Sequence, residues 1–362
     1  MMDKLNIVQK TVMALILATM VLLVAVPLLA FTTVAFSNSV EMTEFPKRLI
    51  PKRTVTVKVA PTSEGEFEIF YDSGEGYESI ITTKRASKLE AHFTRQYAVT
   101  VPGEELVQDF KQTLTDGPME FTYKKDLFYN FKTFFSIVPN AAGALKNSII
   151  VSLYTILISL GIGSLAGFAM ARFQFKFKEQ INVSLLIVRM FPVVGISIPM
   201  AMLLIKFGLF DTRIGLALLY SVPNIALTAW ITNSIFIGIN KELEEASMIF
   251  GANSVQTFAK ITLPLAFPAL AASSMYSFLT AWNDTISALI LTNKNQTLSL
   301  VVYKAIGTTS SGIQYAAAGS IVLILPALVF TFIIRKYIGQ MWGGVEPVSY
   351  THLRAHETRR HL

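Results

Sequence analysis

Long stretches without charged residues constrain this chain more than any other feature. Residues 11–36 carry no charge. Five further runs, uncharged or nearly so, follow at 147–171, 181–205, 214–240, 262–283 and 313–334. The 26 residues of the first run would form a helix about 39 Å long, and a hydrocarbon core is about 30 Å thick. The sequence therefore predicts six membrane spans, the first a retained anchor because it exceeds the apolar core of a signal peptide.

Composition supports an integral membrane protein. Hydrophobic residues make up 52% of the 362-residue chain and charged residues only 15%, whereas a soluble domain carries about 25% charged residues. The shortage of charge argues against a soluble enzyme and against disorder. The chain has no cysteine, and three of its four histidines lie in the last eleven residues. We therefore expect no catalytic residues, no metal site and no cofactor in this chain.

Basic residues indicate how the spans are oriented. The net charge is +7, and most Lys and Arg residues lie beside apolar runs, which favours a membrane over nucleic acid as the partner. With the N-terminus inside, inside segments carry nine Lys or Arg residues and the short outside loops carry four. By the positive-inside rule, both termini are expected in the cytoplasm.

The spans divide the chain into regions. Residues 1–36 hold the N-terminal end and first span, 37–140 form an extracytoplasmic insert, and 141–340 hold the remaining spans. In the insert, RTVTVKV (53–59) and EFEIFY (66–71) alternate polar and apolar residues, which predicts a small β-rich module. Residues 349–362 are polar and hold three histidines, so we interpret them as a non-native tail.

The most informative segment is the predicted inside loop at 241–268, KELEEASMIFGANSVQTFAKITLPLAFP. Acidic residues at its start favour a helix N-terminus. Gly251 can adopt the left-handed conformation that ends a helix, and Asn253 with Gln256 forms a potential capping box. The segment thus predicts a helix–turn–helix on the cytoplasmic surface, continuous with the fifth span at Pro264.

This segment resembles the EAA loop of binding-protein-dependent ABC transporter permeases. In that pattern, Glu245-Ala246-Ser247 is followed after three residues by Gly251, and nine residues later by Ile261, Leu263 and Pro264. Ser247 and Phe250 depart from the usual alanine and aspartate. The resemblance implies that loop 241–262 couples the spans to an ATPase. The residues implied in coupling are Glu244, Glu245, Ala246, Ser247, Gly251 and Ala252.

A second motif, Trp282-Asn283-Asp284, resembles the signature of carbohydrate-type (maltose/maltodextrin) permeases. An ionisable group at membrane depth usually faces a bundle interior or a watery cavity. We therefore expect these three residues to line a sugar pathway. A hydrogen bond between helices is an equally good explanation of Asp284.

The resemblance implies the six-helix bundle of a type I ABC importer permease. Such a chain is an all-α membrane protein of the bacterial inner (plasma) membrane, and it imports a di- or oligosaccharide. The resemblance also implies three kinds of protein partner: ATPase subunits holding ATP and Mg, a second permease subunit and an extracytoplasmic solute-binding protein. No GxxxxGK[ST] loop occurs in the sequence, so ATP hydrolysis is expected in a separate protein and the chain is not expected to be an enzyme. Two alternatives stay open: a permease for an amino acid, peptide or ion, and a membrane sensor with an outer ligand-binding module.

Overall fold

The computed structural model describes residues 7–42, 50–72, 76–307 and 312–342. The chain divides into two compact units. The first comprises Met1–Lys146 and Thr297–Leu325, and the second comprises Asn147–Gln296 and Pro326–Leu362. The boundaries fall inside two long helices, α6 (Ala141–Arg172) and α16 (Gly312–Trp342), so each helix contributes to both units. The tail at 349–362 lies outside the described residues.

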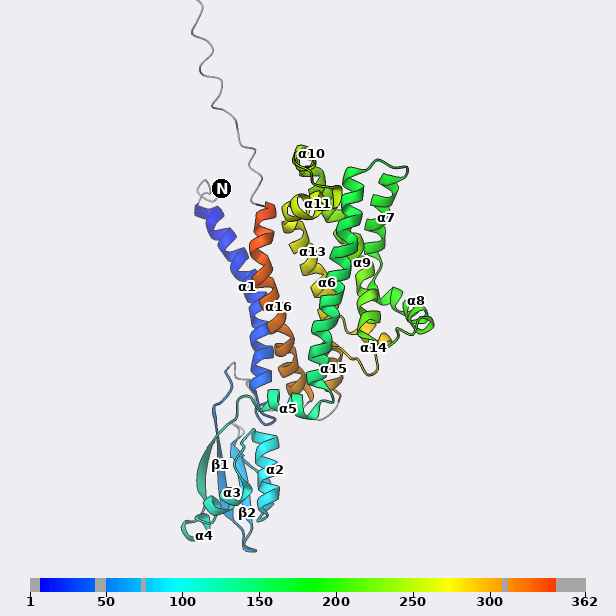
Figure 1. Ribbon diagram of the computed structural model, residues 1–362. Helices are drawn as coiled ribbons and strands as arrows, with labels where there is room; N and C mark the ends of the chain where they lie inside the picture. The colour runs from blue at the N-terminus through cyan, green and yellow to red at the C-terminus, as the bar shows by residue number, and fades with distance from the viewer. Residues whose placement is uncertain (1–6, 43–49, 73–75, 308–311, 343–362) are drawn as a thin grey trace, which may run out of the picture. The chain divides into compact units, whose positions relative to one another are not determined.

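In the first unit, the polar insert forms an antiparallel sheet with the strand order β3-β2-β1-β4 (Figure 1). The strands are β1 (Thr54–Pro61), β2 (Phe67–Asp72), β3 (Tyr77–Thr83) and β4 (Met119–Lys124). The predicted strands at 53–59 and 66–71 are confirmed as β1 and β2. In β1, buried Val55 and Val57 alternate with exposed Thr54 and Thr56, because successive side chains point to opposite faces of a sheet.

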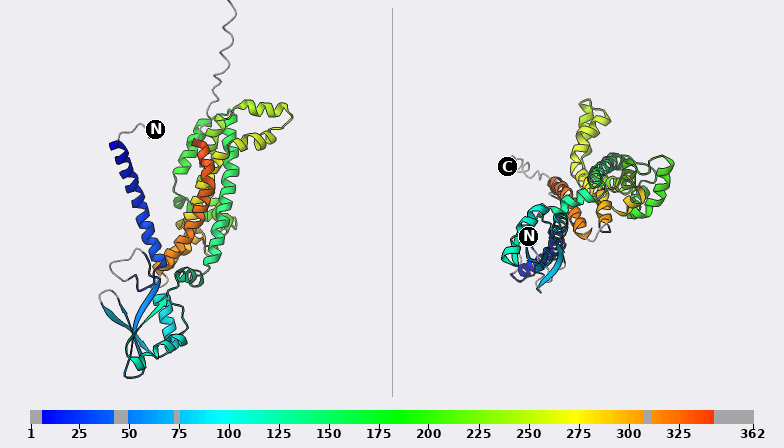
Figure 2. Two further views of the ribbon diagram at one scale, coloured as in Figure 1. Left: turned by 90° about the vertical axis from the view of Figure 1, so that its left-hand side faces the viewer. Right: turned by 90° about the horizontal axis from the view of Figure 1, so that it is seen from below.

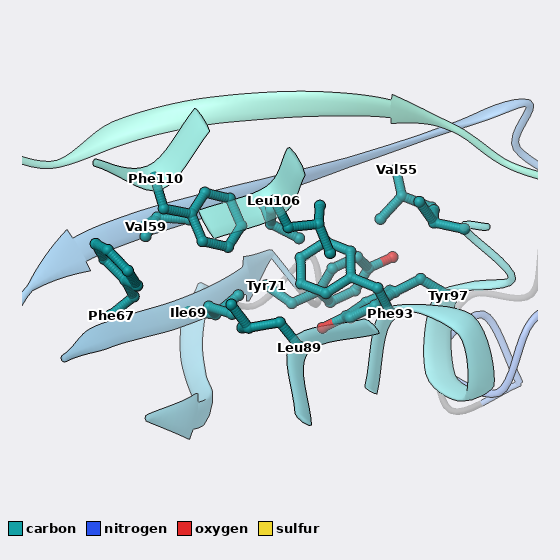
Figure 3. Close-up of a cluster of buried hydrophobic side chains, with 12 residues drawn as sticks. Val55, Val59, Phe67, Ile69, Tyr71, Leu89, Phe93, Tyr97, Leu106 and Phe110 are labelled. Atoms are coloured by element: carbon teal, nitrogen blue, oxygen red, sulfur yellow. The ribbon is translucent and has the colours of Figure 1, made fainter. Parts of the chain in front are cut away.

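Helices cover the buried face of this sheet. They are α2 (Ala86–Tyr97), α3 (Gly103–Phe110) and the short α4 (Thr113–Asp116). Figure 3 shows Leu89 and Phe93 of α2, with Leu106 of α3, beside Val59 and Ile69 of the sheet. The sequence analysis missed these helices, although buried residues recur every fourth position in α2. The insert is therefore mixed α/β rather than simply β-rich.

The rest of the first unit is helical. It contains α1 (Ile7–Phe36), α5 (Tyr129–Ile137), α15 (Leu298–Ala305) and the first parts of α6 and α16. The side-chain amide of Asn130 in α5 donates to the carbonyl oxygens of Ala35 and Ser37, at 2.9 and 2.8 Å. These bonds satisfy two of the carbonyls that every helix leaves free at its C-terminus and tie the end of α1 to α5.

A buried ion pair joins the segment after α1 to the end of the sheet. The Lys125 ammonium lies 2.7 Å from a Glu41 carboxylate oxygen, and the two side chains are 1% and 6% exposed. Glu41 also accepts from the backbone N–H of Asn38 at 3.2 Å. Because both charges are shielded from water, each depends on the other for its stabilisation.

The second unit holds most of the predicted spans, with α9 at its centre. Its elements are the rest of α6, α7 (Lys178–Met190), α8 (Val193–Lys206), α9 (Arg213–Gly238), α10 (Lys241–Ile249), α11 (Ser254–Thr257), a π-helical turn (Phe258–Thr262), α12 (Leu263–Leu265), α13 (Phe267–Asn283), α14 (Ile286–Leu291) and the rest of α16. Helix α9 packs against α7, α8 and α13. Its buried Ser221, Asn224 and Thr232 each donate to the carbonyl four residues earlier, so these three side chains are satisfied within their own helix.

Among the described residues, four helices are long and apolar enough to cross a membrane, or six if each of two bent pairs counts as one span. The four are α1, α6, α9 and α16. The bent pairs are α7 with α8, at 96°, and the α11–α12 segment with α13, at 75°. The predicted count of six spans is therefore not established, because the predicted third and fifth spans are both broken.

Prolines explain where these breaks fall. Pro192 lies between α7 and α8, and it has no N–H with which to continue the helix. Pro264 in α12 and Pro268 in the first turn of α13 also lack an N–H, and they lie on either side of Ala266, where the chain breaks. The predicted continuity of the cytoplasmic loop with the fifth span at Pro264 is therefore wrong.

Candidate functional site

The EAA-like segment folds into a hairpin of two helices, α10 and α11, which projects from the helical part of the second unit (Figure 2). We call residues 241–257 the α10–α11 hairpin. The side chain of Asn240 caps α10 by accepting from the N–H of Glu242 at 3.0 Å. Gly251 has φ +91° and turns the chain, and the capping box of Asn253 and Gln256 starts α11. The predicted helix–turn–helix is thus confirmed.

Glu244 lies at the buried base of this hairpin. Its side chain is 9% exposed and its carboxylate oxygen lies 2.7 Å from the guanidinium of Arg172 at the end of α6. Arg172 Nε donates to the other carboxylate oxygen at 2.9 Å, and the Thr262 hydroxyl donates at 2.9 Å. Burial alone would raise the pKa of Glu244, but the hydrogen bonds from Arg172 and Thr262 and nearby positive charge lower it below its ordinary value.

Arg172 also binds the end of α9. Its guanidinium donates to the carbonyl oxygens of Phe236 and Ile239, at 2.7 and 3.2 Å. Phe236 lies in the last turn of α9 and Ile239 is its C-cap residue, and the carbonyls at this end of a helix carry negative partial charge. One guanidinium therefore joins three elements: α6, α9 and α10.

The outer surface of the hairpin is apolar and exposed. Ile249, Phe250 and Val255 are 84%, 91% and 75% exposed, and they lie around the turn at Gly251. Glu245, Ala246 and Gly251 are exposed as well. A cluster of large apolar side chains outside a membrane-spanning segment indicates a surface that a partner protein covers.

The remaining predicted residues of the loop are less accessible. Ser247 and Ala252 are half-buried. The Ser247 hydroxyl donates to the carbonyl of Glu244 at 2.8 Å and lies 2.7 Å from the Thr257 hydroxyl, so it holds α10 against α11. The loop residues therefore separate into an exposed set and an internal set.

The sequence analysis missed the role of Arg172. The only signal for it in the sequence is an arginine at the end of an uncharged run of 25 residues.

The second predicted group, Trp282, Asn283 and Asp284, does not converge on one site. Trp282 is fully buried, and its ring stacks on Phe278 with centroids 5.2 Å apart. Asn283 is exposed. The Asp284 carboxylate accepts from the Tyr220 hydroxyl at 2.8 Å and from the backbone N–H of Ser287 at 3.0 Å. Asp284 thus links α9 to the start of α14, as the helix-bridging alternative expects.

A cavity of about 210 Å³ lies beside Trp282. Its walls come from α6, α13 and the second part of α16, and they include Ile149, Phe278 and Phe330. Its accessible wall is apolar, so it offers few hydrogen bonds to a sugar. Within the described residues, no group of three or more His, Asp or Glu side chains could hold a metal ion.

Comparison with known proteins identifies the family. Residues 159–342 match the family described as the binding-protein-dependent transport system inner membrane component. The chain belongs to this family. The matched region of this permease includes the α10–α11 hairpin, α13 and the second part of α6, and it excludes the α/β insert.

Two relatives and one solved structure are similar to this permease. The trehalose transport system permease protein SugB of Mycobacterium tuberculosis is 34% identical over 201 residues, or 54% of this chain and 73% of that protein. The trehalose/maltose transport system permease protein MalG of Thermococcus litoralis is 32% identical over 54% of this chain and 71% of that protein. Both relatives are named as permease proteins of sugar transport systems.

The solved structure is a chain of a bacterial ABC transporter involved in the import of the acidic polysaccharide alginate. It has a TM-score of 0.58 at 17% identity and covers 91% of this chain and 96% of that chain. At this identity the likeness shows a shared fold, which is that of an ABC importer permease. Because the match covers 91% of the chain, it is not confined to the helical region.

Proposed function

We propose that this permease subunit takes part in ATP-driven import of a di- or oligosaccharide, and that its α10–α11 hairpin is the surface on which a separate ATPase docks. The observation that carries the proposal is the exposed apolar turn around Phe250, which is 91% exposed. This turn rests on the buried Arg172–Glu244 pair. A rigid base beneath an exposed apolar surface suits an element that receives force from a partner.

The substrate class follows from the relatives. SugB and MalG are both named as permeases for trehalose or maltose, so we propose a sugar of this kind.

The same kinship supports three protein partners: the ATPase, a second permease subunit and an extracytoplasmic binding protein. The basic residues in the predicted inside loops support a bacterial inner-membrane location with both termini in the cytoplasm.

Among the predicted pathway residues, we propose that Asn283 is the one that contacts sugar. Its side chain is exposed, and an amide can both donate to and accept from sugar hydroxyls. Trp282 and Asp284 hold the end of α13 through ring stacking and hydrogen bonds. They support the proposed pathway without needing to touch the substrate.

Docking is tested with the full complex expressed in bacterial membranes. Phe250→Asp puts a charge on the exposed turn, so we expect loss of the co-purifying ATPase and of ¹⁴C-trehalose and ¹⁴C-maltose uptake. Ile50→Asp is the matched control, because Ile50 is 81% exposed and lies beside the α/β insert. An ATPase that co-purifies equally with the Phe250→Asp variant would refute the docking surface.

A competition assay tests the substrate class. Excess unlabelled disaccharide is expected to reduce the labelled uptake, and excess amino acids, dipeptides or inorganic ions are expected to leave it unchanged. Inhibition by one of these other solutes would instead support a permease of the same fold with a different substrate.

A further inference from the structure

We propose that Arg172 is a positioning residue that fixes the α10–α11 hairpin to α6 and α9, so that movement of the hairpin passes into these two helices rather than along the chain into α13. This inference rests on the proposed function, because it concerns how a docked ATPase moves the spans. Two routes lead from the hairpin to the spans, one through side-chain contacts and one along the backbone.

The side-chain route is short, buried and charged. The guanidinium of Arg172 contacts Glu244 of α10 and two carbonyls at the end of α9, with all five donor–acceptor distances between 2.7 and 3.2 Å. Its side chain is only 8% exposed. Charge-assisted hydrogen bonds shielded from water resist displacement. A movement of α10 therefore carries Arg172 and the end of α9 with it.

Aromatic packing reinforces the same junction. Phe168 of α6 lies one helical turn before Arg172, and its ring centroid is 5.7 Å from that of Phe236 and 4.8 Å from that of Phe258. Phe258 follows α11 directly. The base of the hairpin is thus packed against the ends of both long helices, around the polar contacts of Arg172.

Helices α6 and α9 are closely packed over their length within the second unit. A Cβ added at Gly163 would lie 2.6 Å from Cβ of Thr228, and one at Gly167 would lie 2.1 Å from the Thr232 hydroxyl oxygen. At the opposite ends of the two helices, Arg213 Nε donates to the Asn147 side chain at 2.8 Å. Two helices in such close contact, joined at both ends, are expected to move as one body.

The backbone route is interrupted. After α11 the chain passes through the π-helical turn at 258–262 and then breaks at Ala266, where it bends by 75° into α13. Pro264 and Pro268, on either side of this break, have no backbone N–H to donate. Such a break can absorb rotation, so the backbone itself does not fix the angle between the hairpin and α13.

The chain has no cysteine, so spin labels can be attached at introduced cysteines without other substitutions. One labelled pair joins the hairpin to α6, through Leu243→Cys and Leu157→Cys. A second pair joins the hairpin to α13, through Leu243→Cys and Tyr276→Cys. All three positions are exposed. Distances are measured by pulsed EPR on the full chain in lipid nanodiscs, first alone and then with its ATPase.

In the chain alone, we expect a narrow α10–α6 distance distribution that broadens clearly in Arg172→Gln and Glu244→Gln. Lys176→Gln is the control, since exposed Lys176 lies four residues after Arg172, beyond the end of α6, with its ammonium over the ring of Phe177. An α10–α6 distribution equally narrow in both variants would overturn the proposal. Glu244→Gln retains the shape of the side chain, so the test does not depend on the folding of the arginine variant alone.

With the ATPase bound, we expect ATP to shift the α10–α13 distance and leave the α10–α6 distance unchanged. We also expect Arg172→Lys, which keeps the charge but not the fork of donors, to lower transport per ATP hydrolysed by about tenfold. An ATP-induced shift in the α10–α6 distance would overturn the side-chain route while leaving the docking function intact. Failure of the ATPase to bind the unsubstituted chain would instead overturn the proposed function.

Discussion

At the scale of single residues, two carboxylates hold separate parts of the second unit in place. Glu244 binds Arg172 and Thr262 beneath the hairpin. Asp211 has φ +55° and accepts from the backbone N–H groups of residues 293, 294 and 295, at 2.9–3.1 Å. Burial would raise the pKa of Asp211, but these three donors lower it. Both carboxylates therefore stabilise the fold as anions.

The contact between Glu244 and Arg172 makes the attachment of the hairpin to α6 and α9 depend on pH. Because the folded-state pKa of Glu244 is lowered, its stabilisation is complete above the ordinary value of 4.5 and is lost as the pH falls through the lower folded pKa. We expect a spin label at Ile249→Cys to become more mobile on acidification from about pH 7 to about pH 3. Glu244→Gln should remove this dependence, and an equal increase in mobility in that variant would contradict the assignment.

At the scale of elements, glycines of one helix have different roles. In α6, a Cβ at Gly167 would lie 2.1 Å from Thr232 Oγ1 and 2.8 Å from the Ala229 carbonyl oxygen, whereas a Cβ at Gly161 meets nothing within 4 Å. Of these two glycines, only Gly167 is required by the packing between α6 and α9. Alternating small and large residues thus set how closely two spans approach.

Gly167→Ala is therefore expected to destabilise the chain by about 1–3 kcal/mol, because the helices must separate to admit the methyl group. Gly161→Ala, on the same helix, should be neutral or slightly stabilising. Thermal unfolding in detergent, followed by fluorescence, measures both variants. Equal melting temperatures for the two would show that α6 and α9 are not in the close contact described.

The turn of the hairpin gives a second prediction. Gly251 has φ +91° and its N–H donates to the Met248 carbonyl at 2.9 Å. Proline at this position imposes φ near −65° and removes the donor, so Gly251→Pro should abolish coupled transport without unfolding the bundle. Gly238→Ala is the control, since a Cβ there meets nothing and φ is not positive. ATP hydrolysis and uptake are measured together, and normal coupling in Gly251→Pro would refute the role of the turn.

The sequence predicted elements best where the pattern is local. The strands β1 and β2, the turn at Gly251 and the capping box at Asn253 follow from short-range rules and are confirmed. The Arg172–Glu244 pair joins residues 72 positions apart, and no short-range rule detects it. The broken fifth span was missed because an uncharged run reveals length and polarity but not backbone direction.

At the scale of the whole molecule, two different kinds of core occur in one chain. The α/β insert buries Phe93, Phe110 and Ile69 in a core like that of a soluble domain. The second unit instead buries many small and hydroxyl-bearing residues, such as Ala229, Ser273 and Ser277, and exposes large apolar ones. This inversion is expected when the surrounding solvent is lipid.

The buried ion pair of Glu41 and Lys125 can be used to test what stabilises the first unit. Lys125→Met leaves Glu41 buried without its partner, which should lower the stability of the first unit by about 3–5 kcal/mol. The double variant with Glu41→Gln should recover much of that loss, because no charge remains buried. Resistance of the insert to limited proteolysis in the full chain measures both, and equal resistance in the single variant and the unsubstituted chain would contradict the pair's contribution.

The break between α7 and α8 has a consequence for the life of the newly made chain. No residue of α7 is buried within the chain, and the backbone leaves helical geometry at Phe191 and Pro192. Lipid cannot hydrogen-bond to irregular backbone, so such segments persist at membrane depth only beside protein or water. In the proposed complex, a copy left without a second permease subunit would be poorly solvated there and open to membrane proteases. Balanced synthesis of the two subunits would then be a condition for this one to survive.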